Sequence, residues 1–274
     1  MALSDDPVVA EYRRCRPAPA LRPYVADYSG WRQRGGPPAR HRGLPSPYLT
    51  FIVTFDEPLV IAAHPDPRQP ASTHRTLLGG LHTAPALITH GGRQAGVQVS
   101  LHALGARALL GLPAGELAQR DLDADDVLGP LATELYERVG AAATWPDRFA
   151  AVDAVLLRRL DPRQQVAAEV RHAWGLLLAR GGRVRADELA AATGWSGRHL
   201  AARFAVEVGL APKAAARVAR FDRARRLLQG DPDRCLADLA GAAGFYDQAH
   251  LAREFRALAG CPPSTWVAEE LRQG

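Results

Sequence analysis

Two stretches near the end of the chain, DELAAATGWSGRHLAARFAVEVGLAP (187–212) and ADLAGAAGFYDQAHLAREFRALAGCPP (237–263), repeat one short pattern. In each, an Ala-rich helix is expected to end at a glycine suited to a left-handed turn, and a polar residue, Ser196 or Asp247, stands where the cap of a second helix belongs. Each copy therefore predicts a helix-turn-helix unit. Neither has enough large apolar residues for its own core, so we expect a shared one. The second copy carries one extra residue after its glycine, and the matching pairs are Leu189 and Leu239, Gly194 and Gly244, Trp195 and Phe245, Leu200 and Leu251, Phe204 and Phe255.

The segment between the copies, residues 212–229, predicts one long helix. It opens with a proline, which suits a first turn, and continues with side chains at helical spacing: Val218, Phe221, Arg225 and Leu228. At 1.5 Å per residue such a helix would span roughly 27 Å. Recognition helices enter successive major grooves about 34 Å apart, so a connector of this length would let one chain read two grooves.

The segment from about 166 to 272 closely resembles the DNA-binding domain of the AraC/XylS family of transcription regulators. The resemblance implies two helix-turn-helix units joined by a long helix and double-stranded promoter DNA as the partner. It also implies activation through contact with RNA polymerase. The motifs that carry it are G-W-S-x-R-H-L-x-x-R-F at 194–204, G-L-A-P-K at 209–213, A-R-R-L-L at 224–228, G-F-Y-D-Q-A-H-L-x-R-x-F at 244–255 and G-C-P-P at 260–263.

In the second unit the resemblance places Gln248, His250 and Arg253 on the base-facing side of a recognition helix expected over 247–259. Glutamine can form two hydrogen bonds with adenine N6 and N7, and arginine can form two with guanine O6 and N7. We therefore predict that these three side chains read bases.

In the first unit Arg198 is the candidate for base reading. The chain departs here from the common family pattern, because Ala202 stands where the family often has arginine and the arginine is shifted to Arg203. Arg203 lies about 140° around the helix from Arg198, so we do not expect it to share the base-facing side. The first unit is expected to read fewer bases and to serve more as an anchor.

Phosphate contacts are expected from the connector and from the backbone N–H groups at the starts of the two recognition helices. His199 either reaches a phosphate or packs beside Trp195, and the sequence leaves both open. For each arginine a solvated charge is an equal alternative. The residues expected to position DNA are Ser196, His199, Lys213, Arg217, Arg220 and Asp247.

The first half of the chain lacks helical periodicity over residues 20–100 and is rich in Gly, Pro and His. Clusters of turn residues separate its short β-prone runs, which predicts a small β-barrel or β-sandwich. These runs are Tyr24–Trp31, Tyr48–Phe55, Leu59–Ala63, Ala86–His90 and Gly96–Ser100.

From Leu101 to about residue 160 the pattern becomes helical, and an amphipathic helix is expected over Trp145–Leu160. Pro162 disfavours helical continuation from Asp161, so the chain is divided into residues 1–162 and 163–274. The predicted fold class is α+β, with a β-rich N-terminal domain that ends in helices and an all-α DNA-binding domain.

AraC-type regulators commonly carry an N-terminal barrel that binds a small effector, forms a dimer, or both. The resemblance implies a small-molecule effector and a homodimer as further partners. Aromatic side chains in the presumed barrel are candidate walls of an effector pocket, with core packing as the alternative, and one histidine could bond the ligand. The candidates are Tyr24, Tyr28, Trp31, Tyr48 and His82.

We expect no metal and no cofactor. The barrel histidines lack the close H-x-H pair and following glutamate of a cupin-type centre, and His82 to His90 is too long a spacing for a local clamp. We interpret the histidines as turn or surface residues, with one or two lining a cavity. The acidic run at 121–126 precedes an expected helix and is explained by the helix dipole. The six histidines are His41, His64, His74, His82, His90 and His102.

No nucleophile elbow or phosphate-binding glycine loop is present, so we do not expect an enzyme. Cys15, Cys235 and Cys261 are far apart and odd in number, which gives no disulfide framework. A barrel-domain enzyme or a thiol-based sensor tethered to a DNA-binding domain remains the alternative function.

Charge adds little, because the 34 basic residues include a single lysine, Lys213, among many arginines. Residues 1–166 carry 18 basic and 17 acidic side chains, and residues 167–274 carry 16 and 12, so the small positive excess lies in the second half. There is no signal segment and no run of 18 apolar residues. We expect a cytoplasmic protein without a membrane partner.

Overall fold

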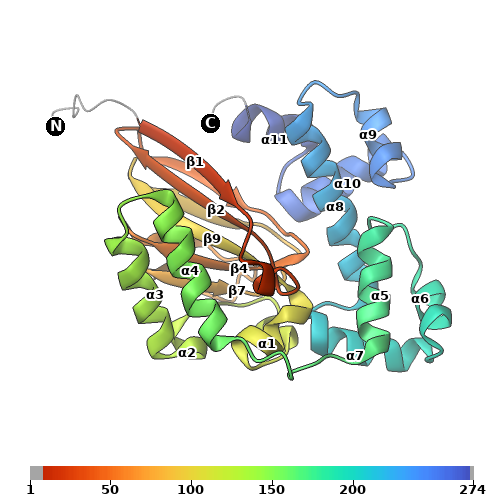
Figure 1. Ribbon diagram of the computed structural model, residues 1–274. Coiled ribbons are helices and arrows are strands. Elements are labelled where there is room, and N and C mark those ends of the chain that lie inside the picture. The colour runs from red at the N-terminus through yellow and green to blue at the C-terminus, as the bar shows by residue number, and fades with distance from the viewer. Residues whose placement is uncertain (1–8, 272–274) are drawn as a thin grey trace.

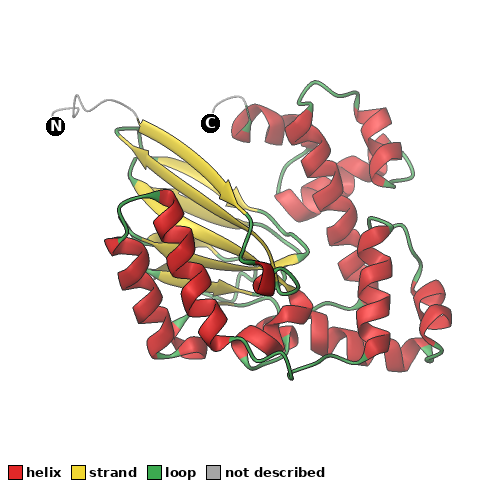
Figure 2. Ribbon diagram, viewed as in Figure 1, coloured by secondary structure: helices red, strands yellow, loops and turns green. Residues whose placement is uncertain are grey.

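The structure, a computed structural model, describes residues 9–271. Its first half is built on two antiparallel sheets (Figures 1 and 2), with the strand orders β1-β2-β9-β4-β7-β10 and β3-β8-β5-β6. Side chains from both sheets pack into one apolar cluster, so the sheets face each other as the predicted barrel or sandwich requires. The strands are β1 (Val9–Cys15), β2 (Val25–Arg34), β3 (Ala39–Gly43), β4 (Tyr48–Thr54), β5 (Leu59–Ala63), β6 (Ser72–His74), β7 (Thr76–Gly79), β8 (Ala86–His90), β9 (Gln94–His102) and β10 (Asp121–Asp123).

Strand β4 contributes apolar side chains to both faces of the six-stranded sheet. Leu49, Phe51 and Val53 join the large core, whereas Ile52 joins the smaller cluster between the sheets. Because successive side chains of a strand point to opposite faces, alternation places apolar residues on both sides. This explains why YLTFIVTF is almost entirely apolar.

Helices cover the face of the six-stranded sheet that points away from the second sheet. Phe149 of α4 stacks on Tyr28 with ring centroids 6.0 Å apart, and the Trp145 ring lies against Gly30. Within the helical region expected between Leu101 and about residue 160, Gly129, where φ is 55°, separates two helices. The helical elements of this half are η1 (Pro19–Leu21), η2 (Ala103–Gly105), α1 (Ala106–Leu110), η3 (Ala114–Leu117), α2 (Asp125–Leu128), α3 (Pro130–Ala141) and α4 (Trp145–Arg159).

The second half is helical, and the 19-residue α8 joins two helix-turn-helix units (Figure 1). Both units contribute to one core. Phe204 packs on Trp174 and Phe255 packs on Phe221, with ring centroids 5.8 Å and 4.9 Å apart. The helices are α5 (Ala168–Ala179), α6 (Ala186–Thr193), α7 (Gly197–Val208), α8 (Pro212–Gly230), α9 (Leu236–Ala243), α10 (Gln248–Ala259) and α11 (Pro263–Glu270).

Between the two halves, residues 160–167 form neither helix nor strand, and the predicted boundary at Pro162 falls within them. The halves nevertheless touch elsewhere. The Arg107 guanidinium binds the Glu207 carboxylate of α7, and Arg42 of β3 pairs with Glu270 of α11. Among the described residues, no helix is long and apolar enough to cross a bilayer.

Candidate nucleic-acid interface

The first recognition helix, α7, begins at the predicted cap. The Ser196 hydroxyl accepts a hydrogen bond from the His199 N–H at 3.3 Å, and Gly194 before it has φ of 69°. Leu200 and Phe204 are buried, which turns the opposite side of the first turn toward solvent. Arg198 lies on that exposed side, and among residues 9–271 it has no hydrogen-bond or ion-pair partner.

The second recognition helix, α10, repeats this construction. The Asp247 carboxylate accepts from the His250 N–H at 2.6 Å, and the buried side is formed by Leu251 and Phe255. Gln248 and Arg253 are exposed, and within the described chain neither side chain has a polar partner. The first two turns of α10 therefore present an amide and a guanidinium to solvent.

His250 is held more firmly than its neighbours. Its Nδ1 accepts from the Tyr246 N–H at 3.3 Å, and its ring packs edge-on against Phe245. These two contacts hold the half-buried imidazole against the turn and restrict its rotation toward a base. Tyr246 itself is 93% exposed and was not singled out in the sequence, although it lies within the G-F-Y-D motif.

The connector residues divide into two kinds. Lys213 is exposed in the first turn of α8 and has no polar partner among residues 9–271. Arg217 instead pairs with Glu254 at 2.8 Å. Arg220 donates to the Gly182 carbonyl at 2.7 Å, and burial lowers the pKa of its guanidinium. Arg217 and Arg220 are thus occupied in holding the helices together.

Two further side chains of the first unit have packing partners. His199 lies edge-on against Trp195, with ring centroids 4.5 Å apart, which realises the packing alternative for that histidine. Arg203 lies 4.0 Å from Glu207, on the side of α7 that meets the N-terminal half. Arg203 is therefore turned away from the Arg198 side.

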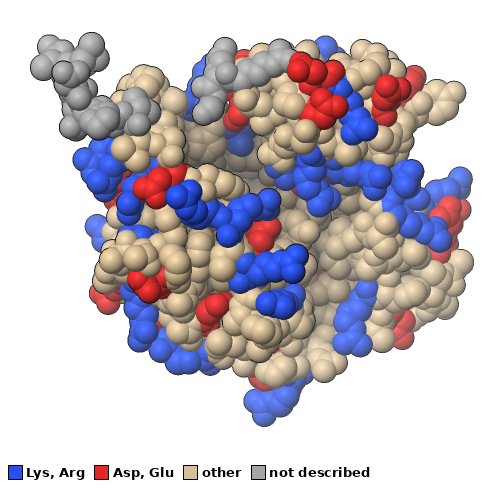
Figure 3. All heavy atoms as spheres, turned by 45° about the horizontal axis from the view of Figure 1, so that its top comes forward, with Lys and Arg blue, Asp and Glu red and all other residues tan. Residues whose placement is uncertain are grey.

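Charges of both signs are interspersed on the face shown in Figure 3, where Lys and Arg lie over both halves with Asp and Glu among them. Several arginines of the second half are neutralised by neighbours, as in the ion pairs of Arg180 with Glu188 and Arg185 with Asp187. Affinity for a polyanion would thus depend on a few placed cations more than on total charge.

A cavity of about 630 Å³ lies between the two sheets and opens toward the second helix-turn-helix unit. The hollow between the halves is visible in Figure 3. The apolar wall of the cavity comes from the cluster between the sheets. Helices α8 and α11 contribute Arg225, Gln229 and Trp266 to its lining. A ligand held there would contact both halves of the molecule.

Two of the five predicted pocket residues, Trp31 and His82, line this cavity. The three tyrosines do not. Tyr28 is fully buried and donates its hydroxyl hydrogen to Asp153 at 2.8 Å, and Tyr24 packs on the same large core. Tyr48 lies against His102, with ring centroids 5.6 Å apart. Core packing, the alternative named for these side chains, describes Tyr24 and Tyr28.

The acidic run at 121–126 does not act only as a helix N-terminus. Asp121–Asp123 is an edge strand, and the Asp121 carboxylate faces His64 and His82 at 3.0 Å and 3.1 Å. The dipole explanation is therefore wrong for Asp121. The sequence did not reveal this contact because His64 and His82 lie 57 and 39 residues before Asp121.

The three cysteines are unpaired thiols: Cys15 is half-buried, Cys235 exposed and Cys261 buried. Burial raises the pKa of the Cys261 thiol, which disfavours the reactive thiolate. The positions of these thiols give no support to a thiol-based sensor.

Comparison with known proteins agrees with this geometry. Residues 189–269 match a helix-turn-helix domain family, and residues 13–123 match a family described as a domain of unknown function. No curated protein matches the chain. The structure of ToxT from Vibrio cholerae is similar over 96% of this chain and 98% of ToxT, with a TM-score of 0.51 and 9% identity.

Two further solved structures match less than two fifths of this chain. The C-terminal domain of AraT, a response regulator from Geobacillus stearothermophilus, is 17% identical, with a TM-score of 0.36 over 38% of this chain and 86% of that one. The DNA-binding domain of the transcription factor AdpA, solved with a target DNA, is 24% identical, with a TM-score of 0.36 over 39% and 96%. The chain therefore carries a helix-turn-helix domain at residues 189–269 and a domain of a family without a described function at residues 13–123, in a fold similar to that of ToxT.

Proposed function

We propose that this regulator reads two successive major grooves of promoter DNA, one with α7 and one with α10. The observation that carries the proposal is that both recognition helices pack on the single helix α8 and present exposed first turns. A 19-residue helix spans about 28 Å, close to the roughly 34 Å between successive major grooves.

On these two helices, Arg198, Gln248 and Arg253 are the base-reading candidates that have no competing contact inside the described chain. His250 remains a candidate through the edge of its ring that does not face Phe245. Lys213 is the phosphate contact best supported by exposure. Ser196 and Asp247 act through the backbone N–H groups that they order at the helix starts.

The direct test is selection of bound sequences from a random DNA pool by the full chain. We expect two short boxes whose centres lie about one helical turn apart and that are not related by a palindrome. A single box, or two palindromic half-sites, would contradict reading of two grooves by one chain.

Arg198 and Arg203 provide a matched pair on one helix. Arg198→Ala should weaken binding and relax preference at one base of the first box, whereas Arg203→Ala should leave base preference unchanged because its side chain pairs with Glu207. Equal effects of the two variants on base preference would contradict the assignment of α7.

Lys213→Ala tests the phosphate contact separately. Loss of one phosphate contact weakens binding by a similar factor on all sequences and reduces the slope of log K against log salt by about 1. Arg217→Ala is the control, because Arg217 already pairs with Glu254. An unchanged salt slope for Lys213→Ala would remove Lys213 from the interface.

We infer that the inter-sheet cavity binds a small-molecule effector and passes its effect to DNA binding. The cavity wall includes Arg225 of α8 and Trp266 of α11, so an occupant touches the scaffold of the second unit. A solved ToxT structure is described as bound to an unsaturated fatty acid, which supports such a use of the fold.

An unsaturated fatty acid is therefore a suitable first probe. Binding should raise the melting temperature and alter the affinity for the selected DNA, and Ile61→Trp, which fills the cavity, should abolish both effects. Effects that survive in the filled variant would place the ligand elsewhere.

We further propose, from the family resemblance, activation through contact with RNA polymerase and dimerisation through the N-terminal domain, and, from the proline that disfavours a continued helix, a domain boundary near Pro162. Transcription in vitro from a promoter carrying the selected site checks the sign of regulation. Sedimentation of the full chain and of residues 163–274 alone checks the second and third points, since only the full chain should dimerise.

A further inference from the structure

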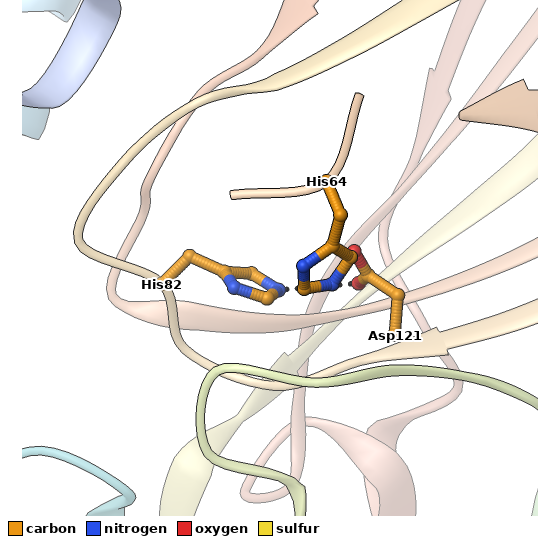
Figure 4. Close-up of side chains that lie close together, drawn as sticks. All are labelled: His64, His82 and Asp121. Atoms are coloured by element: carbon orange, nitrogen blue, oxygen red, sulfur yellow. Dashed lines mark hydrogen bonds and ion pairs between the residues drawn. The ribbon is translucent and has the colours of Figure 1, made fainter. Parts of the chain in front are cut away.

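Three segments that are distant in sequence bring His64, His82 and Asp121 together beside the cavity (Figure 4). His64 follows β5, His82 follows β7 and Asp121 opens β10. Their ligand atoms all lie within 4.8 Å of one another, and no other such group of three occurs among residues 9–271. His82 and Asp121 also line the cavity wall.

The spacing of the three groups fits a small cation. Nε2 of His64 lies 3.0 Å from one Asp121 oxygen, and Nε2 of His82 lies 3.1 Å from the other. A tetrahedral ion with bonds of about 2.0–2.2 Å holds its ligand atoms about 3.4 Å apart. Around such an ion the two imidazole–carboxylate separations would open by a few tenths of an ångström, and all the ligand atoms lie within 4.8 Å of one another.

The cluster is buried and its polar atoms are incompletely satisfied. The side chains of His64 and Asp121 are 2% and 7% exposed. Within the described residues, His82 Nδ1 is buried and has no hydrogen-bond partner, and the buried His64 Nε2 has the Asp121 carboxylate, 3.0 Å away, as its polar neighbour. A buried carboxylate between two imidazoles with unmet bonding capacity favours a cation that accepts lone pairs from all three.

The backbone of Asp66 contacts the second ring nitrogen of His64 through both an N–H and a carbonyl. His64 Nδ1 lies 2.9 Å from the Asp66 N–H and 3.3 Å from the Asp66 carbonyl oxygen. In the shorter contact Nδ1 accepts from the Asp66 N–H, so an ion on Nε2 requires a change to the tautomer whose Nδ1–H donates to the Asp66 carbonyl. Histidine ligands commonly use their second nitrogen in this way.

We propose that His64, His82 and Asp121 bind one divalent transition-metal ion of the zinc, cobalt and nickel class. Two imidazoles and one carboxylate suit these ions, whereas Ca²⁺ and Mg²⁺ prefer shells made of oxygen. Three protein ligands leave a coordination position open. Because His82 and Asp121 face the cavity, that position takes water or the anionic group of a cavity ligand.

The test is titration of the chelator-treated full chain with Co²⁺, followed by visible absorption. We expect saturable binding of one Co²⁺ per chain with the intense d–d bands of a four- or five-coordinate ion. Zn²⁺ should displace the Co²⁺ and abolish the bands. Weak, unsaturable absorption like that of aqueous Co²⁺ would overturn the proposal and leave a hydrogen-bonded network only.

Variants locate the ion. Asp121→Asn keeps the size of the side chain but removes its charge, and His82→Ala removes a ligand at the cavity wall without altering β10. Both should lose the Co²⁺ bands and the rise in melting temperature with Zn²⁺, with folding checked by circular dichroism. His172→Ala, on the exposed side of α5, is the control and should bind like the unmodified chain.

Binding of unchanged strength in folded Asp121→Asn or His82→Ala would place the metal elsewhere and refute the site. Should one variant fail to fold, the other decides. Azide, a small anion that coordinates Co²⁺, should shift the spectrum, and an unchanged spectrum would contradict the open position. Because no DNA is present, a negative result here is distinct from failure of the groove-reading proposal.

Discussion

At the scale of single residues, the arginines of the DNA-binding half differ in what already occupies them. Arg217 pairs with Glu254, Arg220 donates to the Gly182 carbonyl, and Arg223 donates to the Ala242 carbonyl. Arg198 and Arg253 have no such partner within residues 9–271. A guanidinium whose donors are unused in the free protein gives up no internal bond when it contacts a base or phosphate.

Arg253→Ala should cost about 1–3 kcal/mol of binding free energy and relax the preference for one base pair, because arginine reads guanine through two hydrogen bonds. Titration of the variant against the selected site and its single-base substitutions measures both effects. Arg256→Ala, one turn further along α10 and also exposed, is the control and should keep the base preference. Uniform weakening of Arg253→Ala on every sequence would identify a phosphate contact instead.

The sequence predicted the residues whose role is decided by their immediate neighbours. Ser196 and Asp247 were recognisable as caps because the serine and aspartate side chains bond N–H groups three residues away. It could not separate Arg198 from Arg220, because the partner of Arg220 lies 38 residues away. Such a contact becomes visible only once the helices are packed.

At the scale of elements, the turn of each helix-turn-helix unit depends on a left-handed glycine. Gly194→Ala should lower the free energy of unfolding by about 1–2 kcal/mol, because an L side chain is strained at a φ of 69° although the space around it is open. Urea denaturation measures the change. Gly241→Ala, in the interior of α9 with open space, is the control and should be stabilising by up to about 1 kcal/mol. Loss of stability in both variants would contradict the conformational explanation.

The strands that the sequence did not predict are mostly sheet edges. β1, β3, β6 and β10 lie at the ends of the two strand orders, and β1 is largely exposed. An edge strand need not bury a whole face, so it lacks the alternation that reveals a strand. The central strands β4, β5 and β8 were predicted nearly to the residue because each buries apolar side chains at alternate positions, and β4 does so on both faces over part of its length.

The β-rich half contains imidazoles whose protonation destabilises the fold. Burial lowers the pKa of His41, His90 and His102; nearby His90 lowers that of His41 further, whereas Glu57 and Asp27 oppose the shifts of His90 and His102 respectively. In the unfolded chain these imidazoles have their ordinary pKa of about 6.5, so the unfolded chain binds their protons more readily than the folded chain does. The stability these groups contribute is complete above that pH and decreases as the pH falls toward the folded values.

His102→Gln should therefore reduce the loss of stability between about pH 8 and about pH 5.5, since glutamine cannot gain the proton. Urea midpoints at the two pH values measure the loss. His172→Gln, at an exposed position on α5, should show the same loss as the unmodified chain. A loss of equal size in His102→Gln would show that this imidazole is not responsible.

At the scale of the whole molecule, the contacts between the halves are closer than the linker at 160–167 suggested. Gly115 of η3 approaches α7 so closely that a Cβ there would lie 2.5 Å from the Val206 carbonyl oxygen. The first recognition helix is thus braced at its C-terminal end by the N-terminal half, while its first turn stays exposed.

These long-range arrangements set the limit of sequence reasoning. The His64, His82 and Asp121 cluster was overlooked because metal spacing was sought locally, whereas the sheets bring its members together from three separate segments. The cavity likewise depends on Arg225 and Trp266 meeting the barrel, and no pattern within either half indicates that meeting.

The ion pair between Arg107 and Glu207 joins the two halves, and its removal should be costly. Two hydrogen bonds of 2.7 Å and 2.9 Å connect the side chains, and the Glu207 side chain is 3% exposed. Arg107→Ala leaves that carboxylate buried with only Arg203 at 4.0 Å, so we expect a loss of about 3 kcal/mol in unfolding free energy.

Replacing both partners distinguishes two contributions to the loss of stability: the burial of an unpaired charge and the loss of the contact itself. Arg107→Met with Glu207→Leu should recover most of the stability, because no unpaired charge then remains buried. Urea denaturation of the two single variants and the double variant gives the coupling energy. The double variant also tests whether the brace matters for DNA. If it binds the selected site with unchanged affinity at both boxes, the pair serves stability alone, whereas weakening confined to the first box shows that the N-terminal half positions α7.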